Sequence, residues 1–404
     1  MKKIGFIIFF IGCGDIGEGY KWNDSEPAGF YRNFGTRGYD YGRGASYSPF
    51  DNGTIITGSQ QPVIGLQKNL WAIKTDQRGF STWDKSFGGD YDDEGYDVIS
   101  TSDGGFLFIG YTWSYGNEQQ IYIIKTDLHG NLKWQNTYGG SMWDVGYAGL
   151  EIKGGSYIIV GYSNSPGISS GNTDMLLMKI DQNGNLVWMK SYGNEAFPNH
   201  EWAYDIEIAI DGFILVGSRD RYENGSKNSL IVKVDDFGNL LWEKEIITEG
   251  LINEEAYSVS KGLDGFMYVC SSINSINNLE NYKPRITKID GSGNIIWQRK
   301  FEANGFDYHQ FRANSSIYEN SLYIVGTSVS NSIIGYRSNV FVTKIDGNGN
   351  IRWSKPHGTS NEDDWGWNIH ERPDKSLIVI GSTKSYNASL FDIFLIGINS
   401  DGVK

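Results

Sequence analysis

A ten-residue pattern, Lys-x-Asp-x-x-Gly-Asn-x-x-Trp, recurs along almost the whole chain of 404 residues and constrains its fold more than any other feature. Five copies keep the pattern, and the first copy along the chain has Phe80 in place of the Asn. The copies lie at 74–83, 125–134, 179–188, 233–242, 288–297 and 344–353, so successive repeats are 51 to 56 residues apart. A period near 50 residues is typical of propellers and solenoids, and it indicates one repeated array rather than unrelated domains.

Each repeat is predicted to contain four antiparallel strands. A short alternating strand such as 96–99 is followed by a turn, often Asp-Gly, and then by an apolar run that ends in Gly, such as 106–110. Asp-Gly between apolar segments favours a hairpin, and a continuous apolar run indicates a strand buried on both faces. A third strand, such as 121–126, then leads through the repeated turn to a strand that carries the Trp. Four such strands make one propeller blade.

The blade count and the closure of the ring follow from the two chain ends. A seventh unit runs from 358 to about 398 and stops before its Trp strand. Near the N-terminus, Phe30 precedes Phe34 by the four residues that separate Trp from Phe or Tyr in other units. Residues 29–34 are therefore expected to complete the last blade and leave no free sheet edge. The prediction is an all-β, seven-bladed propeller of four-stranded antiparallel blades over residues 29–404.

The N-terminus has the pattern of an export signal. Lys2 and Lys3 precede a nine-residue apolar run, 4–12, which is too short to span a bilayer but fits a signal peptide. The run ends at Cys13 in a context that resembles a bacterial lipid-attachment site. We therefore predict a signal peptide at 1–13 with lipidation of Cys13, and a polar tether at 14–28. Export without a lipid, or a chance apolar start, are the alternatives.

Composition excludes several classes of function. A formal charge of −13 disfavours binding to nucleic acid or anionic lipid. The two cysteines, Cys13 and Cys270, cannot form a disulfide framework, and Cys270 replaces Gly in an apolar run, which predicts a buried, inert thiol. The five histidines lack metal-binding spacing, and no hydrolase elbow or phosphate loop occurs. The residues therefore indicate no catalytic set, no metal site and no cofactor, and we expect a monomer.

Two repeated features have both a functional and a structural interpretation. The Asp-x-x-Gly-Asn turn is similar to a calcium loop, but Arg78 and Phe237 stand where a ligand would be needed, so we expect only a tight turn. The repeated Trp could serve as a sugar-stacking platform. Its fixed place in each blade favours packing between neighbouring blades.

A column of carboxylates precedes the first strand of nearly every blade, three residues before a Tyr or Trp in most units. It comprises Asp40, Asp93, Asp144, Glu201, Glu254 and Asp364, and unit six has Tyr308 there, beside Asp307. These groups could form a ring at one mouth of the central channel. Alternatively, each could accept backbone N–H groups of its own turn, and the recurrence favours that interpretation.

The loops around this column differ from blade to blade and are the better functional candidates. They should lie at one end of the ring, where aromatic residues mixed with carboxylates could form a sugar or peptide groove. Solvated loops without a ligand are the alternative. The candidate ligand-binding residues are Asp93, Trp143, Asp144, His200, Glu201, Trp202, Asp364, Trp365 and Trp367.

The repeat resembles that of a known group of proteins. The pattern Lys-Thr-Asp-x-x-Gly-Asn-x-x-Trp, followed by Tyr-Gly-Gly, Thr-Ser-Asp-Gly-Gly-Phe and Gly-Tyr-Thr, looks like the repeats of secreted bacterial and archaeal β-propeller proteins. The resemblance covers roughly residues 29–404 and implies architecture and export, with no agreed activity. A looser likeness is to quinoprotein-like propellers, including a lipid-anchored scaffold of outer-membrane assembly. Their turn is one residue longer and they have eight blades, which argues against a shared cofactor.

These observations lead to two main hypotheses. The first is an extracytoplasmic, lipid-anchored propeller that binds an envelope protein or glycan through one loop face, without catalysis, and meets the membrane only through its lipid. The second is a polysaccharide hydrolase or lyase with an acidic site at the central mouth, where Asp93, Asp144, Glu201 or His200 would act as acid or base. A purely structural spacer is the third possibility.

Overall fold

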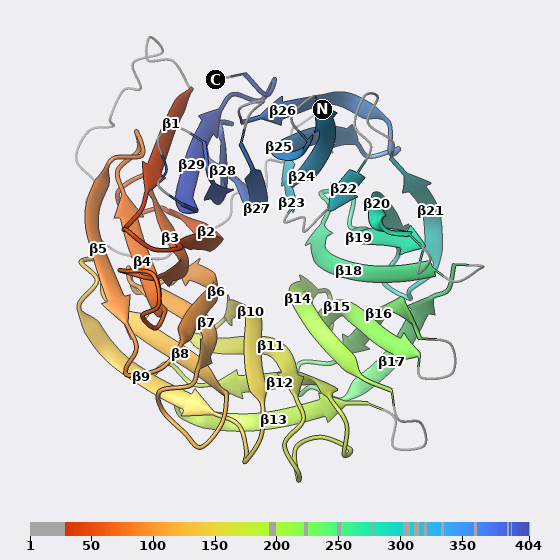
Figure 1. The fold of residues 1–404 in the computed structure, drawn as a ribbon. Helices are drawn as coiled ribbons and strands as arrows, with labels where there is room; N and C mark the ends of the chain where they lie inside the picture. The colour runs from red at the N-terminus through yellow and green to blue at the C-terminus, as the bar shows by residue number, and fades with distance from the viewer. Residues whose placement is uncertain are drawn as a thin grey trace, which may run out of the picture.

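The chain forms a ring of seven antiparallel sheets (Figure 1). The computed structural model describes residues 29–193, 199–221, 225–248, 252–275, 278–301, 308–310, 315–318, 321–332, 335–358, 362–385, 388 and 390–403. The predicted signal peptide, Cys13 and the tether lie outside these residues. The described part of the chain contains no helix with the length and apolar character needed to cross a membrane. The predicted all-β, seven-bladed propeller is confirmed.

The first six blades run from an inner strand to an outer strand in chain order, and the seventh takes its outer strand from the N-terminus. The first blade comprises β2 (Tyr41–Ser48), β3 (Gly53–Gln60), β4 (Asn69–Thr75) and β5 (Ser81–Phe87). The second comprises β6 (Asp93–Ser100), β7 (Phe106–Thr112), β8 (Gln120–Thr126) and β9 (Leu132–Tyr138). The third comprises β10 (Asp144–Ile152), β11 (Ser156–Ser163), β12 (Asp174–Ile180) and β13 (Leu186–Tyr192). The fourth comprises β14 (Glu201–Ala209), β15 (Gly212–Arg221), β16 (Ser226–Val234) and β17 (Leu240–Ile246).

The remaining blades include one interrupted inner strand. The fifth comprises β18 (Ile252–Lys261), β19 (Met267–Ser275), β20 (Asn278–Ile289) and β21 (Ile295–Lys300). In the sixth, β22 (Tyr308–Gln310) and β23 (Ser315–Tyr318) both pair with β24 (Ser321–Ser332), followed by β25 (Gly335–Asp346) and β26 (Ile351–His357). The seventh comprises β27 (Asp364–Glu371), β28 (Leu377–Thr383), β29 (Asp392–Ile398) and β1 (Phe30–Phe34).

The N-terminal strand closes the ring as the spacing predicts. β1 pairs antiparallel with β29, with Phe30 opposite Gly397 and Phe34 opposite Ile393. Phe30 occupies the place of the repeated Trp, because its ring lies against Gly79 of the next blade, where a Cβ would come within 2.4 Å of it. The last blade therefore gains its fourth strand from the other end of the chain.

The repeated turn and the repeated Trp act together at each seam between blades. Asp127 Oδ1 accepts the backbone N–H groups of His129 and Asn131, both at 2.8 Å, which closes the turn. Trp83 of the preceding blade packs on Gly130 of this turn and donates its Nε1–H to the Leu128 carbonyl at 3.0 Å. The interpretations of the motif as a tight turn and of the Trp as interblade packing are both confirmed.

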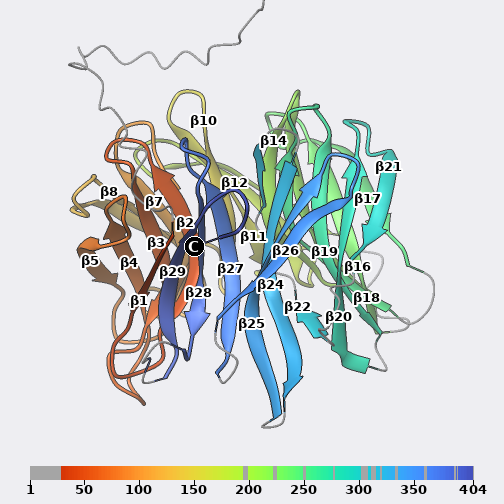
Figure 2. The same ribbon diagram turned by 90° about the horizontal axis from the view of Figure 1, so that it is seen from above.

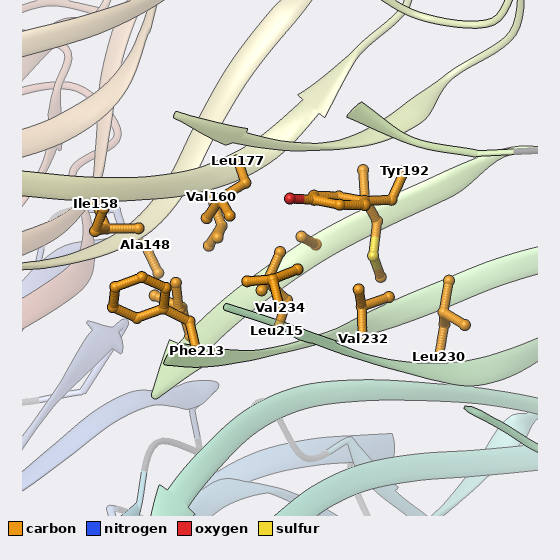
Figure 3. Close-up of a cluster of buried hydrophobic side chains, with 13 residues drawn as sticks. Ala148, Ile158, Val160, Leu177, Tyr192, Phe213, Leu215, Leu230, Val232 and Val234 are labelled. Atoms are coloured by element: carbon orange, nitrogen blue, oxygen red, sulfur yellow. The ribbon is translucent and has the colours of Figure 1, made fainter. Parts of the chain in front are cut away.

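The hydrophobic core is divided among the seams. Seven clusters of buried side chains form among the described residues, and each draws on two neighbouring blades. Figure 3 shows the cluster between blades three and four, where Ile158 and Val160 face Phe213 and Leu215. Cys270 lies buried in the cluster between blades five and six, and burial raises the pKa of its thiol to about 12, as expected for an inert residue.

Candidate functional site in the central channel

Six inner strands contain a β-bulge at the same position. In each, the pairing with the second strand of the blade skips one residue, which stands three residues after the carboxylate of the column. The skipped residues are Arg43, Tyr96, Tyr147, Tyr204, Tyr257 and Trp367. A bulge leaves its extra residue unpaired and redirects the side chain. All six side chains line one central cavity of about 210 Å³.

The five aromatic residues among these six are together called here the aromatic belt: Tyr96, Tyr147, Tyr204, Tyr257 and Trp367. Ring centres of Tyr96 and Tyr147 are 4.8 Å apart, and Tyr204 lies 5.3 Å from both Tyr147 and Tyr257. These separations are within the range of favourable aromatic contacts. Burial raises the pKa of both Tyr96 and Tyr204, so their hydroxyl groups stay protonated.

Arg43 completes the belt on the side of blade one. Its Nε lies 2.7 Å from Oε1 of Glu94, and its guanidinium is 4.6 Å from the ring centre of Trp367 and 5.7 Å from that of Tyr96. Burial lowers the pKa of Arg43, but Glu94, Tyr96 and Tyr111 together outweigh burial and the net change in the pKa is upward. The belt therefore holds one fixed positive charge.

Two carboxyl groups follow the belt residues and tie neighbouring blades together. Asp97 Oδ2 accepts the backbone N–H of Gly149 at 3.1 Å, and Asp205 Oδ2 accepts that of Val259 at 2.9 Å. Both carboxyl groups line the cavity. Burial raises the pKa of Asp97 to about 6 and that of Asp205 to about 8, so Asp205 is largely protonated at neutral pH.

A third carboxyl group in the cavity is that of Glu255. Its Oε2 accepts the hydroxyl of Tyr257 at 2.8 Å and that of Tyr204 at 3.4 Å, while Lys227 Nζ lies 3.0 Å from Oε1. The relation of Tyr204 to Glu255 repeats that of Arg43 to Glu94, with a bulge residue reaching a carboxylate of the next blade.

The carboxylates singled out in the sequence lie at or near the start of the inner strands and are buried. Gly89 and Gly140 donate their N–H groups to Asp93 and Asp144 at 2.9 and 2.8 Å. Asp93, Asp144, Glu201 and Asp364 are at most 2 % exposed, and Glu201 pairs with Arg219 at 2.7 Å. Asp93 and Asp144 thus match the expectation that these carboxylates accept backbone N–H groups of their own turns, whereas the partner of Glu201 is an arginine. Ligand contact by these carboxylates stays a prediction.

The column of unit six is shifted by one residue from its expected position. His309 pairs with Ser328, two residues after Gly326, just as Asp364 pairs with Thr383, two residues after Gly381. His309 and not Tyr308 therefore occupies the column, and Asp307 lies outside the described residues. The predicted place of Tyr308 in the column was wrong because unit six has no carboxylate there, and the carboxylate was the residue used to align the other units.

The predicted aromatic residues do not all line the cavity. Trp367 belongs to the belt, and the ring centres of Trp365 and Trp367 are 6.3 Å apart. His200 and Trp202 stack on each other at 5.8 Å. Trp143 is 48 % exposed in the loop before β10.

Trp143 belongs to a wider exposed surface on the loops at 88–92, 113–119 and 139–143, called here the loop face. Tyr115 OH donates to the Gly88 carbonyl at 2.7 Å, and the N–H of Tyr91 donates to Ser114 Oγ at 3.0 Å, which links two of these loops. Figure 2, turned by 90° from Figure 1, shows loops gathered at the two ends of the ring. The exposed members are Tyr91, Trp113, Tyr115, Met142 and Trp143.

Of the residues that line the cavity, the candidates named from the sequence include Trp367 but not the carboxyl groups of Asp97, Asp205 and Glu255, nor the bulge residues Arg43, Tyr96, Tyr147, Tyr204 and Tyr257. The repeats carried a signal for the bulge residues, since a Tyr or Trp stands three residues after the carboxylate in most units. The bulge that directs these side chains into one cavity left no mark in the alternation. Among the described residues, no group of three His, Cys, Asp or Glu side chains is placed to hold a metal ion.

Solved structures with the same fold include two polysaccharide lyases. An ulvan lyase of polysaccharide lyase family PL25, bound to GlcA(1-4)Rha3S, has a TM-score of 0.57 and 10 % identity, over 92 % of this chain and 97 % of that one. The polysaccharide lyase Uly1 has a TM-score of 0.53 and 10 % identity, over 88 % and 91 %. Drosophila Plexin A, in complex with Semaphorin 1b, has a TM-score of 0.52 and 8 % identity, over 91 % and 86 %. No family model and no curated protein matches the chain. These likenesses show the fold alone.

Proposed function

We propose that the protein is a polysaccharide-degrading enzyme whose active site is the central cavity. The observation that carries this proposal is the bulge shared by six inner strands, which directs five aromatic side chains and Arg43 into one space. Aromatic faces with a few convergent polar groups are typical of small-ligand and sugar sites. The likeness to two polysaccharide lyases is consistent with a saccharide ligand, but it concerns only the fold.

The cavity also offers the groups that glycosidic cleavage needs. Hydrolysis requires a carboxylic acid that protonates the leaving oxygen and a carboxylate that attacks or activates water. Asp97 and Asp205, whose pKa values burial raises, and Glu255, which is held by Lys227 and two tyrosines, have different surroundings. Carboxyl groups in both protonation states are therefore present near neutral pH.

The charge of the cavity favours hydrolysis over elimination. Elimination removes a proton next to the carboxylate of a uronic acid, and that developing negative charge must be stabilised by cations or hydrogen-bond donors. Among the described residues that line the cavity, Arg43 is the only cation, and Glu94 already neutralises it. A uronic acid would also meet Asp97 and Glu255, which carry the same sign of charge.

A panel of neutral, amino and acidic polysaccharides tests the proposal. We expect the full chain to release new reducing ends from at least one of them, without the ultraviolet absorbance of an unsaturated uronic acid. Tyr147→Ala should lose most of this activity, whereas Lys133→Ala, an exposed site on β9, should keep it. An ultraviolet-absorbing product would show that the reaction is elimination and not hydrolysis. If no glycan gave new reducing ends, the proposal of an enzyme would be overturned.

A second candidate is a non-catalytic module that binds a protein or glycan through the loop face. The exposed aromatic and apolar residues there favour it, because such residues on a soluble domain often mark an interaction site.

We further propose, from the N-terminal pattern, that the chain is exported and anchored by a lipid on Cys13. Mass spectrometry of the protein from membranes tests the anchor, and an unmodified Cys13 would contradict it.

A further inference from the structure

The cavity walls carry more acidic than basic groups. Asp97, Asp205 and Glu255 line it, and Arg43 is the single cation among the described lining residues. In the part of the chain that the structure describes, neither Asp97 nor Asp205 belongs to an ion pair, and both accept only backbone N–H groups. A carboxylate in a narrow cavity without a cation is poorly stabilised. The walls therefore favour a positively charged occupant.

The repeated blades show how the belt accommodates a cation. At blade one, the bulge residue Arg43 reaches Glu94 of the next blade, with its guanidinium over the ring of Trp367 at 4.6 Å. Three blades further, the bulge residue Tyr204 reaches Glu255 of the next blade. A neutral phenol therefore stands at blade four where blade one supplies a guanidinium.

The part of the cavity beside Tyr204 fits a small cation. The rings of Tyr147 and Tyr257 each lie 5.3 Å from that of Tyr204, centre to centre, so three aromatic rings border this part of the cavity. Lys227 contacts Oε1 of Glu255, while Oε2 receives the hydroxyls of Tyr204 and Tyr257. Electron-rich ring faces beside carboxylates attract ammonium groups, with about 0.5 to 2 kcal/mol for each cation–ring contact.

We propose that the ligand of the cavity is an amino sugar whose ammonium group lies among Tyr147, Tyr204 and Tyr257, near Asp205 and Glu255. The inference rests on the proposed function in taking the ligand to be a saccharide. The sugar ring stacks on the belt. Its ammonium group favours the ionised form of Asp205, which has no cation beside it among the described residues, and adds a second cation to Lys227 at Glu255. The formal charge of −13 on the whole chain also attracts such a ligand over long range.

A matched pair of ligands tests the charge requirement. An oligosaccharide of β-1,4-linked glucosamine and its fully N-acetylated counterpart of equal length share the same sugar ring, and only the first is positively charged. We expect the full chain to bind the glucosamine oligomer at least about tenfold more tightly in calorimetric titrations. Because the contact is ionic, the preference should shrink as salt is added.

Variants locate the charge recognition. Asp205→Asn and Glu255→Gln should each narrow the preference for glucosamine, whereas Asp236→Asn, at an exposed position after β16 and outside both the cavity and the loop face, should leave it unchanged. The comparison of the two ligands uses the unaltered protein, so it does not depend on whether a variant folds. Equal or tighter binding of the acetylated oligomer overturns the inference, and so does a preference that neither cavity variant reduces.

The outcomes for this inference and for the enzyme are separate. Cleavage of a neutral or acidic glycan, with no preference for glucosamine, refutes the amino-sugar inference and leaves the enzyme standing. Tight, charge-dependent binding of glucosamine without cleavage of any glycan refutes the enzyme and supports the binding site.

Discussion

Arg43 Nε lies 2.7 Å from Glu94 Oε1 although the two residues belong to different blades. The side chain of Glu94 is 4 % exposed, so its charge depends on this partner. Removal of one partner of a buried ion pair typically costs about 3 to 5 kcal/mol. We expect Arg43→Ala to lower the free energy of unfolding by about 3 kcal/mol in denaturant titrations.

Its control is an exposed ion pair in the next blade. Lys133 and Asp103 contact each other at 2.8 Å with both side chains more than 40 % exposed, so Lys133→Ala should cost less than about 1 kcal/mol. Addition of Glu94→Gln to Arg43→Ala should recover part of the loss, because the unpaired charge is then removed. Equal effects of the two alanine variants would show that the seam does not depend on Arg43.

The contact between the turn glycine and the preceding Trp predicts a difference between two glycines. Gly130 and Gly265 both have positive φ, 73° and 82°, so alanine at either should cost about 1 to 2 kcal/mol in backbone conformation. At Gly130 a Cβ would also lie 2.9 Å from the Trp83 ring, whereas nothing lies within 4 Å at Gly265. Thermal unfolding should place Gly130→Ala well below Gly265→Ala. Indistinguishable melting temperatures would argue against tight packing at the seams.

The ion pair between Asp103 and Lys125, the lysine of the repeated motif, should stabilise the fold only within a defined pH range. Lys125 is 1 % exposed and its Nζ lies 2.9 Å from Asp103. Burial opposes ionisation of Asp103, but hydrogen bonds from Lys133, Thr101 and Lys125 together hold its pKa well below the usual range. A lowered pKa stabilises the fold above the unfolded value of about 4, and this stabilisation disappears as the pH falls.

Asp103→Asn should therefore be clearly less stable than the natural protein at neutral pH, and the difference should shrink below about pH 4. Urea titrations at a series of pH values measure it. Asp236→Asn, at an exposed position after β16, is the control and should have little effect at any pH. A difference independent of pH would rule out the carboxylate charge as the cause.

Asp205 predicts a pH dependence of the opposite sign. Burial raises its pKa to about 8, and Asp97 and Glu207 add negative charge nearby. Between about pH 4 and pH 8 the native state holds a proton that the unfolded state has released, so this group's contribution to stability falls as the pH rises. Its share of the slope is at most about 1.4 kcal/mol per pH unit.

Asp205→Asn removes this contribution but keeps one oxygen to accept a backbone N–H group. The stability of the variant should therefore vary less between about pH 4 and pH 8 than that of the natural protein. Parallel stability curves for the two proteins would contradict the raised pKa of Asp205.

Two aromatic residues distinguish the cavity from the loop face as the binding site. Tyr147 lines the cavity, whereas Trp143 is exposed in the loop before β10. If the cavity binds the saccharide, Tyr147→Ala should weaken binding by about tenfold and Trp143→Ala should change it little. The reverse order in calorimetric titrations would move the site to the loop face and favour the non-catalytic module.

Much of the fold could be predicted because the repeats obey local rules. The Asp that closes each turn and the Trp seven residues later are set by a hairpin whose contacts are short in sequence. The spacing of Phe30 and Phe34 placed the closing strand, since β1 must present the same side chains to its neighbours as the other outer strands do. Unit six departed from the prediction where its own residues depart from the repeat.

The site could be predicted only in part. The sequence showed a carboxylate column and a Tyr or Trp three residues later, and it drew attention to the carboxylates, which the structure buries against their own loops. The later residue proved to be the one that lines the cavity, because a bulge in each inner strand directs it there. The extra residue of a bulge shifts the alternation by one, but this shift is not visible in an inner strand as short as β6, which mixes polar and apolar residues on both sides of the bulge.

The sequence by itself determined the number of repeats, the four-strand plan of the blades and the segment that closes the ring, because these follow from turns and burial patterns that recur about every 50 residues. Only the tertiary structure decided which residues meet in the channel. Arg43 and Glu94, or Tyr204 and Glu255, are about 51 residues apart in sequence, and they meet only when the blades curve into a ring. Contacts of that kind depend on the packing angle between sheets, which the apolar clusters at the seams set together and no single repeat encodes.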